Sequence, residues 1–165
     1  MSKLSVSIIG YNEDCCLDRC LSSVKDADEI IYVDCESFDD SVEVAKKYTD
    51  KIYSRKNNPN LNVNKSFGFT KATNEWLLYI DPDESVSYEL WKEIKEIINS
   101  NSKYDGYYMP RKNYYFGKWL KRGAKYPDYQ LRLFKKDKGE FQCAHVHEKI
   151  KVDGKLGYLK NPILH

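Results

Sequence analysis

The sequence has no long apolar run, little glycine or proline, and no marked excess of charge of one sign. Its apolar stretches are only a few residues long, too short for a membrane-spanning helix or a secretory signal. Eight Gly, five Pro and a 41% hydrophobic content exclude collagen-like and disordered classes. The 27 basic and 25 acidic residues nearly balance, which argues against nucleic-acid binding. We expect a cytoplasmic globular chain whose 165 residues form a single domain.

The cysteines do not have the pattern of a disulfide framework. Their number is odd, five, and Cys15, Cys16 and Cys20 lie within six residues of one another. We expect them to be reduced and partly buried. Tyrosine, in contrast, is abundant with 14 copies, seven of them between Tyr104 and Tyr129. Amphipathic rings at this density suit a hydroxyl-rich ligand or a membrane interface.

Short apolar runs alternate with amphipathic segments over residues 1–102. We expect strands at 4–9, 29–33, 51–54 and 76–80, and helices near 17–24, 40–48, 64–72 and 90–98. This alternation predicts an α/β fold with a doubly wound, mostly parallel sheet. Residues 103–165 contain short strand candidates at 106–109, 130–134 and 149–152. We interpret this second half as an antiparallel extension of the same sheet.

Polar side chains follow the expected strands, at the edge where doubly wound sheets bind their ligands. They are Tyr11, Asn12 and Glu13 after the first strand, Asp34 after the second, and Asp81 and Asp83 after the fourth. These groups are expected to converge on one rim. The G-x-G-x-x-G fingerprint of a dinucleotide site is absent.

The sharpest local motif is Asp81-Pro82-Asp83, directly after an apolar strand. Two carboxylates in such a turn can hold Mg²⁺ or Mn²⁺, which then neutralises the charge of a nucleotide diphosphate. An acidic turn that caps the next helix is the alternative. His147 is a candidate for one further ligand to this metal. Cys143, His145 and His147 alternate, but their spacing is tighter than that of usual structural zinc sites.

Asp128 and Arg132 are candidates for chemistry in the second half. Asp128 lies in a turn before an expected strand and can serve as a general base, or simply cap backbone N–H groups. Arg132 can hold a phosphate or carboxylate with two hydrogen bonds. The segment 111–125 mixes six cations with aromatic rings, a composition that suits RNA, sugars, an anionic membrane surface or a solvated loop.

Together these segments resemble the family 2 glycosyltransferases of the GT-A fold, and especially small bacterial lipopolysaccharide-core β-1,4-glucosyltransferases. The opening SVSIIGYNEDCCLDRCLSSV, the segments YVDCESFDD and NEWLLYIDPDE, and the later YYFGKWLKRGAKYPDYQLRLFKK and VHEKI carry the likeness. They cover nearly the whole chain in the family's order.

The resemblance implies an inverting, metal-dependent transfer of a sugar from a nucleotide diphosphate, expected to be UDP. The acceptor would be a hydroxyl of a cell-envelope glycan, a glycolipid or a peptide, with peripheral contact to an anionic membrane. Tyr11, Glu13 and Asp34 would contact the nucleoside, and Lys65, Asp81 and Arg132 the rest of the donor. Asp81, Asp83 and His147 would hold Mg²⁺ or Mn²⁺, and Asp128 would deprotonate the acceptor.

Three departures from the family pattern stand out. Glu36 replaces the usual Gly in the loop after the second strand, NKSF replaces the commoner pair around Lys65, and DPD replaces D-A-D. Two other functions stay open beside glycosyl transfer. One is a metal-dependent nucleotidyltransferase, although a Gly-rich basic loop after the first strand is absent. The other is a degenerate module that binds a nucleotide-sugar without catalysis.

Overall fold

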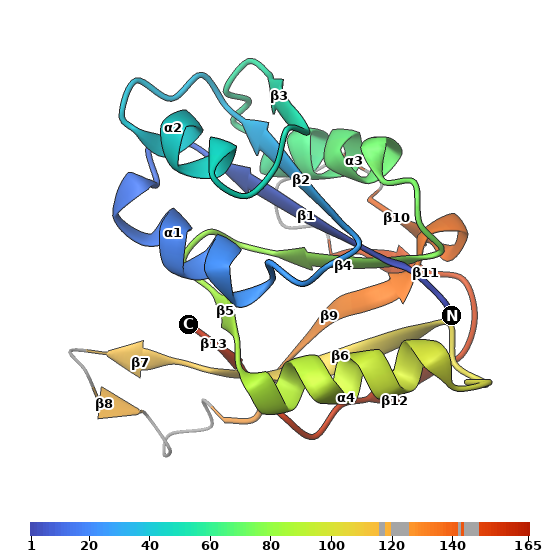
Figure 1. The fold of residues 1–165 in the computed structure, drawn as a ribbon. Coiled ribbons are helices and arrows are strands. Elements are labelled where there is room, and N and C mark those ends of the chain that lie inside the picture. Colours follow the sequence, from blue (N-terminus) through green and yellow to red (C-terminus); the bar gives the residue numbers. More distant parts are fainter. Residues whose placement is uncertain (116–117, 120–125, 142, 144–148) are drawn as a thin grey trace.

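A computed structural model of the chain describes residues 1–165 except 116–117, 120–125, 142 and 144–148. Its centre is a nine-stranded sheet in the order β3-β2-β1-β4-β9-β6-β13-β5, with β12 paired to β6 (Figure 1). The strands are β1 (Leu4–Gly10), β2 (Glu29–Asp34), β3 (Ile52–Ser54), β4 (Trp76–Ile80), β5 (Ser85–Val86), β6 (Gly106–Lys112), β9 (Asp128–Lys135), β12 (Leu156–Tyr158) and β13 (Ile163–Leu164). Two small hairpins stand apart from it, β7 (Tyr114–Tyr115) with β8 (Lys118–Trp119) and β10 (Gly139–Glu140) with β11 (Lys151–Val152).

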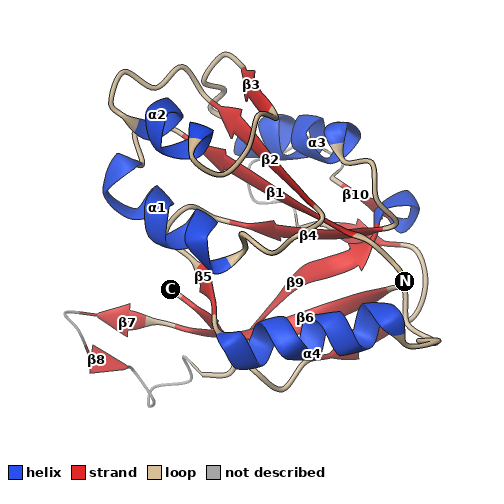
Figure 2. Ribbon diagram, in the orientation of Figure 1, coloured by secondary structure: helices blue, strands red, loops and turns tan. Residues whose placement is uncertain are grey.

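Four helices cover the two faces of this sheet (Figure 2). They are α1 (Asp14–Ser23), α2 (Ser41–Lys46), α3 (Leu61–Lys71) and α4 (Tyr88–Asn99), with a 3₁₀ turn at Lys136–Lys138. Residues of α1, α2 and α4 pack in one hydrophobic cluster around Val6 and Ile8 of β1. Phe69 of α3 packs in a second cluster, with Ile9 of β1 and Phe134 of β9. Alternate residues of β1 therefore enter two cores, as expected of a strand covered on both faces.

Local signals explain where two of the helices begin. The Ser87 hydroxyl accepts a hydrogen bond from the Leu90 N–H at 3.2 Å and caps α4, and Asn60 caps α3 through the Asn62 N–H at 3.1 Å. Gly68 lies inside α3 because a Cβ there would be 2.5 Å from the Ser7 hydroxyl. The helix thus crosses the sheet too closely for a side chain at that point.

The expected fold class is confirmed, with differences in the second half. β1, β2, β3 and β4 are parallel, and β9 runs antiparallel to β4 and β6. The second half extends the sheet with the expected antiparallel pairs, β9 with β4 and β6 and β13 with β5, but β12 and β13 are parallel to β6. The strand expected at 149–152 is also not part of the main sheet, since its residues 151–152 pair with Gly139–Glu140 instead.

Candidate functional site

A cavity of about 380 Å³ opens where β1 and β4 end. Its polar and charged lining includes Tyr11 and Glu13 after β1, Asn57, Lys65 from α3, and Asp81 and Asp83 after β4. His165, directly after β13, completes the wall. We call this the first cavity. The rim expected from the parallel sheet therefore exists, and α3 and β13 add a cation and an imidazole to it.

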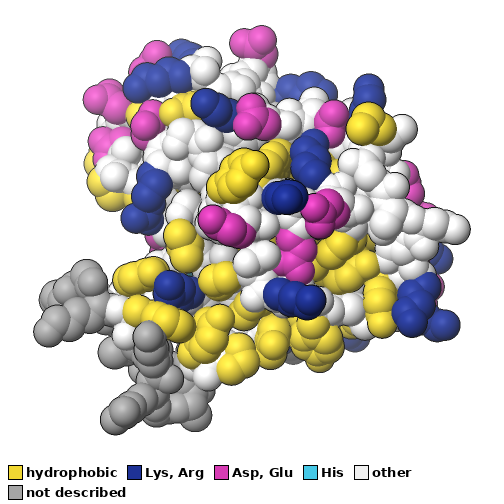
Figure 3. Space-filling view, turned by 60° about the horizontal axis from the view of Figure 1, so that its bottom comes forward, with side chains coloured by type: hydrophobic (Ala, Val, Ile, Leu, Met, Phe, Trp, Pro, Cys, Tyr) yellow, Lys and Arg dark blue, Asp and Glu magenta, His cyan; other side chains and the backbone are white. Residues whose placement is uncertain are grey.

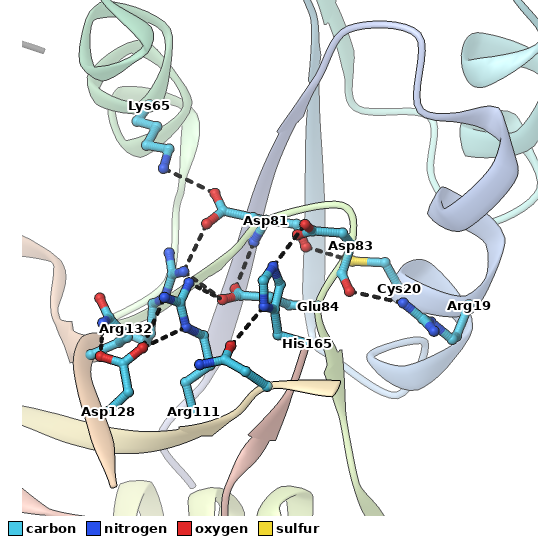
Figure 4. A network of polar contacts seen from close by, with 12 residues as sticks. Arg19, Cys20, Lys65, Asp81, Asp83, Glu84, Arg111, Asp128, Arg132 and His165 are labelled. Carbon is cyan, nitrogen blue, oxygen red and sulfur yellow. Dashed lines mark hydrogen bonds and ion pairs between the residues drawn. The ribbon is translucent and has the colours of Figure 1, made fainter. Parts of the chain in front are cut away.

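Asp81 lies between two cations (Figure 4). Its Oδ1 is 2.9 Å from Lys65 Nζ, and its Oδ2 accepts a hydrogen bond from Arg132 Nη2 at 2.7 Å. Burial alone would raise the pKa of Asp81, but the charges of Arg132 and Lys65 outweigh it and hold that pKa well below its usual range. Asp81 is therefore ionised, and both of its oxygens are engaged by the protein.

Arg132 also contacts a second, fully buried carboxylate. Its Nη2 is 2.6 Å from Glu84 Oε1, and the side chains of Arg132 and Glu84 are 3% and 0% exposed. Glu84 Oε2 in turn accepts the Asp81 N–H at 2.9 Å, which closes the turn after β4. Burial raises the pKa of Glu84, and the neighbouring Asp81 adds to this against the opposing effect of Arg132. The guanidinium lies 4.4 Å from the centre of the Tyr79 ring, so one buried cation joins β9, β4 and the acidic turn.

Asp83 faces a residue that the sequence interpretation missed. Its Oδ2 is 3.0 Å from His165 Nε2, and the other ring nitrogen of His165 lies 2.7 Å from Asn113 Oδ1. Backbone hydrogen bonds fix this position, because the His165 N–H donates to Lys112 O at 3.0 Å. A lone histidine after a short apolar run gives no sequence signal for this role. Its place follows from the pairing of β13 with both β6 and β5.

Asp34, at the end of β2, has an unsatisfied buried oxygen. The residue is 4% exposed, and its Oδ2 accepts the Ser37 N–H at 3.2 Å. Its Oδ1 has no hydrogen-bond partner among the described residues. Leaving a buried acceptor unpaired costs about 1–3 kcal/mol, so a ligand N–H at this point would be favourable. The following residue, Cys35, lines the first cavity.

The turn after Asp34 shows why the family pattern has glycine there. Glu36 has a φ of +61°, in the left-handed region that glycine enters without steric cost. Glu36 therefore adopts this turn with strain. Phe38, which follows, meets the Tyr11 ring edge-on at 6.1 Å, and the two side chains are 83% and 41% exposed.

A second cavity of about 280 Å³ adjoins the first, and Lys65 and Asp81 line both. Its other polar walls come from β6 and β9 and include Arg111, Gln130 and Arg132. Asp128 is held directly behind this wall, because its carboxylate contacts Arg111 at 2.8 Å and accepts from Gln130 Nε2 at 2.7 Å. Although burial raises the pKa of Asp128, these hydrogen bonds outweigh it and lower that pKa.

Two further expectations fall outside or only partly inside the described residues. His147 and His145 lie outside them. Cys143 is described and contacts the Asn62 carbonyl through its Sγ at 3.4 Å. Of the basic and aromatic segment 111–125, the structure describes residues 111–115 and 118–119, and the centre of the Trp119 ring lies 4.1 Å from Lys112 Nζ.

The acidic turn was tested as a site for Mg²⁺ or Mn²⁺. Over the described part of the chain, no group of three or more His, Cys, Asp or Glu side chains is arranged to hold a metal ion. These ions, however, typically use one or two protein carboxylates and complete their shell with water and substrate phosphates. Asp83, 52% exposed at the cavity with His165 beside it, fits that requirement. Asp81 fits it less well, because both of its oxygens contact cations.

The chain is similar to known glycosyltransferases. Residues 5–152 match the family described as Glycosyl transferase family 2. An uncharacterised glycosyltransferase of Rickettsia typhi is 41% identical over 106 residues, which is 62% of this chain and 35% of that protein. The lipopolysaccharide core biosynthesis glycosyltransferase LpsC of Rhizobium meliloti is 26% identical over 93% of this chain and 59% of its own length. The chain thus spans about a third to three-fifths of these relatives.

Solved structures share the fold. Residues 1–349 of TarS from S. aureus superpose with a TM-score of 0.73 at 16% identity, over 98% of this chain and 60% of that one. TarS has also been crystallised with UDP-GlcNAc; that structure has a TM-score of 0.59 at 21% identity, over 73% of this chain and 37% of that one. Glucosyl-3-phosphoglycerate synthase from Mycobacterium tuberculosis, with Mn²⁺ and UDP-glucose, gives 0.54 at 18% identity, over 70% and 44% of the two chains. Within the described residues of this chain, no helix is both long and apolar enough to span a membrane.

Proposed function

The chain belongs to glycosyl transferase family 2, and from this premise we propose that it transfers a sugar from UDP to an acceptor hydroxyl with inversion and with the help of a divalent metal. We place the acceptor among cell-envelope glycans and glycolipids, the class that the name of the LpsC relative indicates. The whole of residues 1–165 would act as one domain, with 1–102 binding the donor and 103–165 the acceptor.

One observation carries the proposal, namely the arrangement of charges around the first cavity. Among the described residues, the Asp83 carboxylate at this cavity contacts no Lys or Arg side chain, while Lys65, held by Asp81, lines the same cavity. A diphosphate in this cavity would meet the ammonium of Lys65 on one side and a metal held by Asp83 and His165 on the other. When bound, the metal would neutralise negative charge that builds up on the leaving diphosphate.

The nucleoside end of the donor fits the same cavity. Asp34, whose neighbour Cys35 lines the cavity, offers an unpaired, buried carboxylate oxygen to a base N–H. Tyr11, directly after β1, offers an exposed ring at the same cavity. Uracil carries one ring N–H that can donate to such an oxygen. This supports UDP as the donor nucleotide, with Glu13 at the mouth as a further nucleoside contact.

Asp128 is our proposed general base for the acceptor. It lies behind the wall of the second cavity, on the far side of Arg132 from the acidic turn, so it is separate from the residues assigned to the diphosphate. Its lowered pKa keeps it ionised at neutral pH, which a base requires. Arg111 and Gln130 orient the carboxylate, and an acceptor hydroxyl would have to displace or share one of these hydrogen bonds.

Titration calorimetry with UDP in the presence and absence of Mn²⁺ tests the donor site. We expect Mn²⁺ to strengthen UDP binding to the wild type, and Asp83→Asn to remove that strengthening while the protein stays folded. Asp137→Asn, at an exposed carboxylate of the 3₁₀ turn, is the matched control and should behave as the wild type. Equal UDP affinity with Mn²⁺ and with EDTA in the wild type would contradict the metal site. Preferential binding of ATP over UDP would favour a nucleotidyltransferase.

A further inference from the structure

Three tyrosine rings from three neighbouring strands form a continuous aromatic surface beside the second cavity. Tyr108 of β6 and Tyr158 of β12 are register partners, and their rings stack with centres 5.2 Å apart and planes at 20°. Tyr129 of β9 meets Tyr158 edge-on at 5.0 Å. We call Tyr108, Tyr129 and Tyr158 the tyrosine platform. Because its members stand on paired strands rather than loops, their relative positions are fixed by the sheet.

Two rings of this surface are exposed, and the third, Tyr108, is partly buried. Tyr158 is 62% exposed and Tyr129 42%, values far above those of the core aromatics. Among the described residues, the three phenolic oxygens have no hydrogen-bond partner. The underside of the molecule, which includes the lower edge of the sheet where β12 lies in Figure 1, carries several hydrophobic side chains among charged ones (Figure 3). An aromatic surface with unused hydroxyl groups matches a ligand that has both an apolar face and many hydroxyls.

The platform is continuous with the candidate active site. Tyr108 and Tyr129 line the second cavity, which also contains Lys65 and Asp81 of the donor site. Tyr158 extends this aromatic wall outward into solvent. The cavity, at about 280 Å³, is close to the lower end of the range of about 300–1,000 Å³ for small-molecule sites, so it suits one small ring rather than an extended chain.

We propose that the tyrosine platform binds a sugar ring of the acceptor, so that the acceptor is a saccharide at least two rings long. This rests on the proposed function. The reacting ring would occupy the second cavity, with its hydroxyl towards Asp128 and the donor, and the next ring would stack on Tyr158, with Tyr129, whose ring stands at 79° to that of Tyr158, at its side. The C–H face of a pyranose lies on the aromatic rings, and the phenolic oxygens and Gln130 hydrogen-bond its hydroxyls. Tyr158 is then a specificity-determining residue that touches neither the donor nor the metal.

A glycan array of mono- to tetrasaccharides, probed with the full chain with and without UDP and Mn²⁺, tests the platform. We expect the wild type to bind a subset of di- and longer saccharides, and Tyr158→Ala to weaken this binding about tenfold, the size of effect that one aromatic stacking contact produces. Tyr158→Phe keeps the ring and should retain most of the binding. Tyr88→Ala, which removes a 78% exposed ring from α4, should have no effect.

The outcomes separate the platform from the donor site, because UDP affinity is measured on the same variants by calorimetry. A wild type that binds UDP but no saccharide, or a Tyr158→Ala variant with unchanged saccharide binding, would overturn the platform and leave the donor site intact. A wild type that binds no UDP but binds saccharides in a Tyr158-dependent way would overturn the donor site and leave the platform intact. A dimer in sedimentation that Tyr158→Ala dissociates would also overturn the proposal, since the rings would then serve contact between two copies of the chain.

Discussion

The buried contact between Arg132 and Glu84 provides the sharpest test of what stabilises the site. Neither side chain reaches solvent, with exposures of 3% and 0%, and their charged atoms are 2.6 Å apart. Replacing Arg132 by Met fills a similar volume but leaves Glu84 buried with only the more distant Arg111, whose Nη1 is 3.7 Å from Glu84 Oε1, as a cation among the described residues. Breaking a buried pair in this way costs about 3–5 kcal/mol. We expect Arg132→Met to lower the free energy of unfolding by about that amount in urea denaturation followed by tryptophan fluorescence.

A second substitution separates the stranded charge from lost packing. Glu84→Gln removes the charge but keeps an amide oxygen that can accept the Asp81 N–H. The double variant Arg132→Met with Glu84→Gln should therefore recover most of the loss, because replacing both members of a buried pair is often nearly neutral. A loss below about 1 kcal/mol for Arg132→Met alone would refute this reasoning, since Glu84 would then be stabilised by other groups. So would a double variant that is no more stable than the single one.

Three further predictions concern the turn after β2, Glu29 at the start of β2, and the proposed base Asp128. Glu36→Gly should raise the unfolding free energy by about 1 kcal/mol by relieving the left-handed strain, whereas Glu96→Gly in α4 should lower it by about 1 kcal/mol; equal losses in urea would contradict the strain. Burial alone would raise the pKa of Glu29, but hydrogen bonds from Lys51, Ser5 and Thr73 lower that pKa to about 2. The ionised Glu29 therefore contributes fully to the free energy of unfolding above the usual carboxyl pKa range, and this contribution is lost as the pH falls towards 2. Glu29→Gln should thus destabilise the protein at pH 7 and reduce the loss of stability between pH 6 and 2, which thermal unfolding over that pH range can check. If the loss of stability at acid pH is unchanged in Glu29→Gln, other acidic residues cause it. Asp128→Asn should cut turnover by about 10²–10⁴-fold with UDP affinity unchanged, measured with an acceptor or as donor hydrolysis, and near wild-type turnover would move the base elsewhere.

The first half of the fold was predictable because its local signals agree with its tertiary contacts. The runs that became β1, β2 and β4 are mostly apolar and are buried throughout, as expected of strands covered on both faces, and they end at Gly10, at Asp34 and just before Asp81. The starts of α1 and α3 were placed too late, near residues 17 and 64 instead of 14 and 61. Asn60 caps α3 through a side-chain hydrogen bond that no hydrophobic period reveals.

The second half was less predictable because its strands are short and paired with distant segments. β12 and β13 contain three and two residues, too few to show a period, and both run parallel to β6. Parallel pairing needs a long connection, so nothing near either strand in sequence indicates its partner. His165 was missed for the same reason. Its approach to Asp83 depends on where β13 enters the sheet between β6 and β5.

The two aspartates of the acidic turn show what spacing alone leaves undetermined. The sequence places Asp81 and Asp83 two residues apart and gives them the same chemistry, so both were expected to hold the metal. Their surroundings are set instead by residues far away in the chain, Lys65 on α3 and Arg132 on β9, which take both oxygens of Asp81. A third cation there would compete with two that are already in place, one of them on a fully buried arginine. Among the described residues, the Asp83 carboxylate contacts no Lys or Arg side chain but only the imidazole of His165, which can turn towards the same ion. We therefore propose Asp83 rather than Asp81 as the metal ligand, with Asp81 holding the lysine that would face the diphosphate.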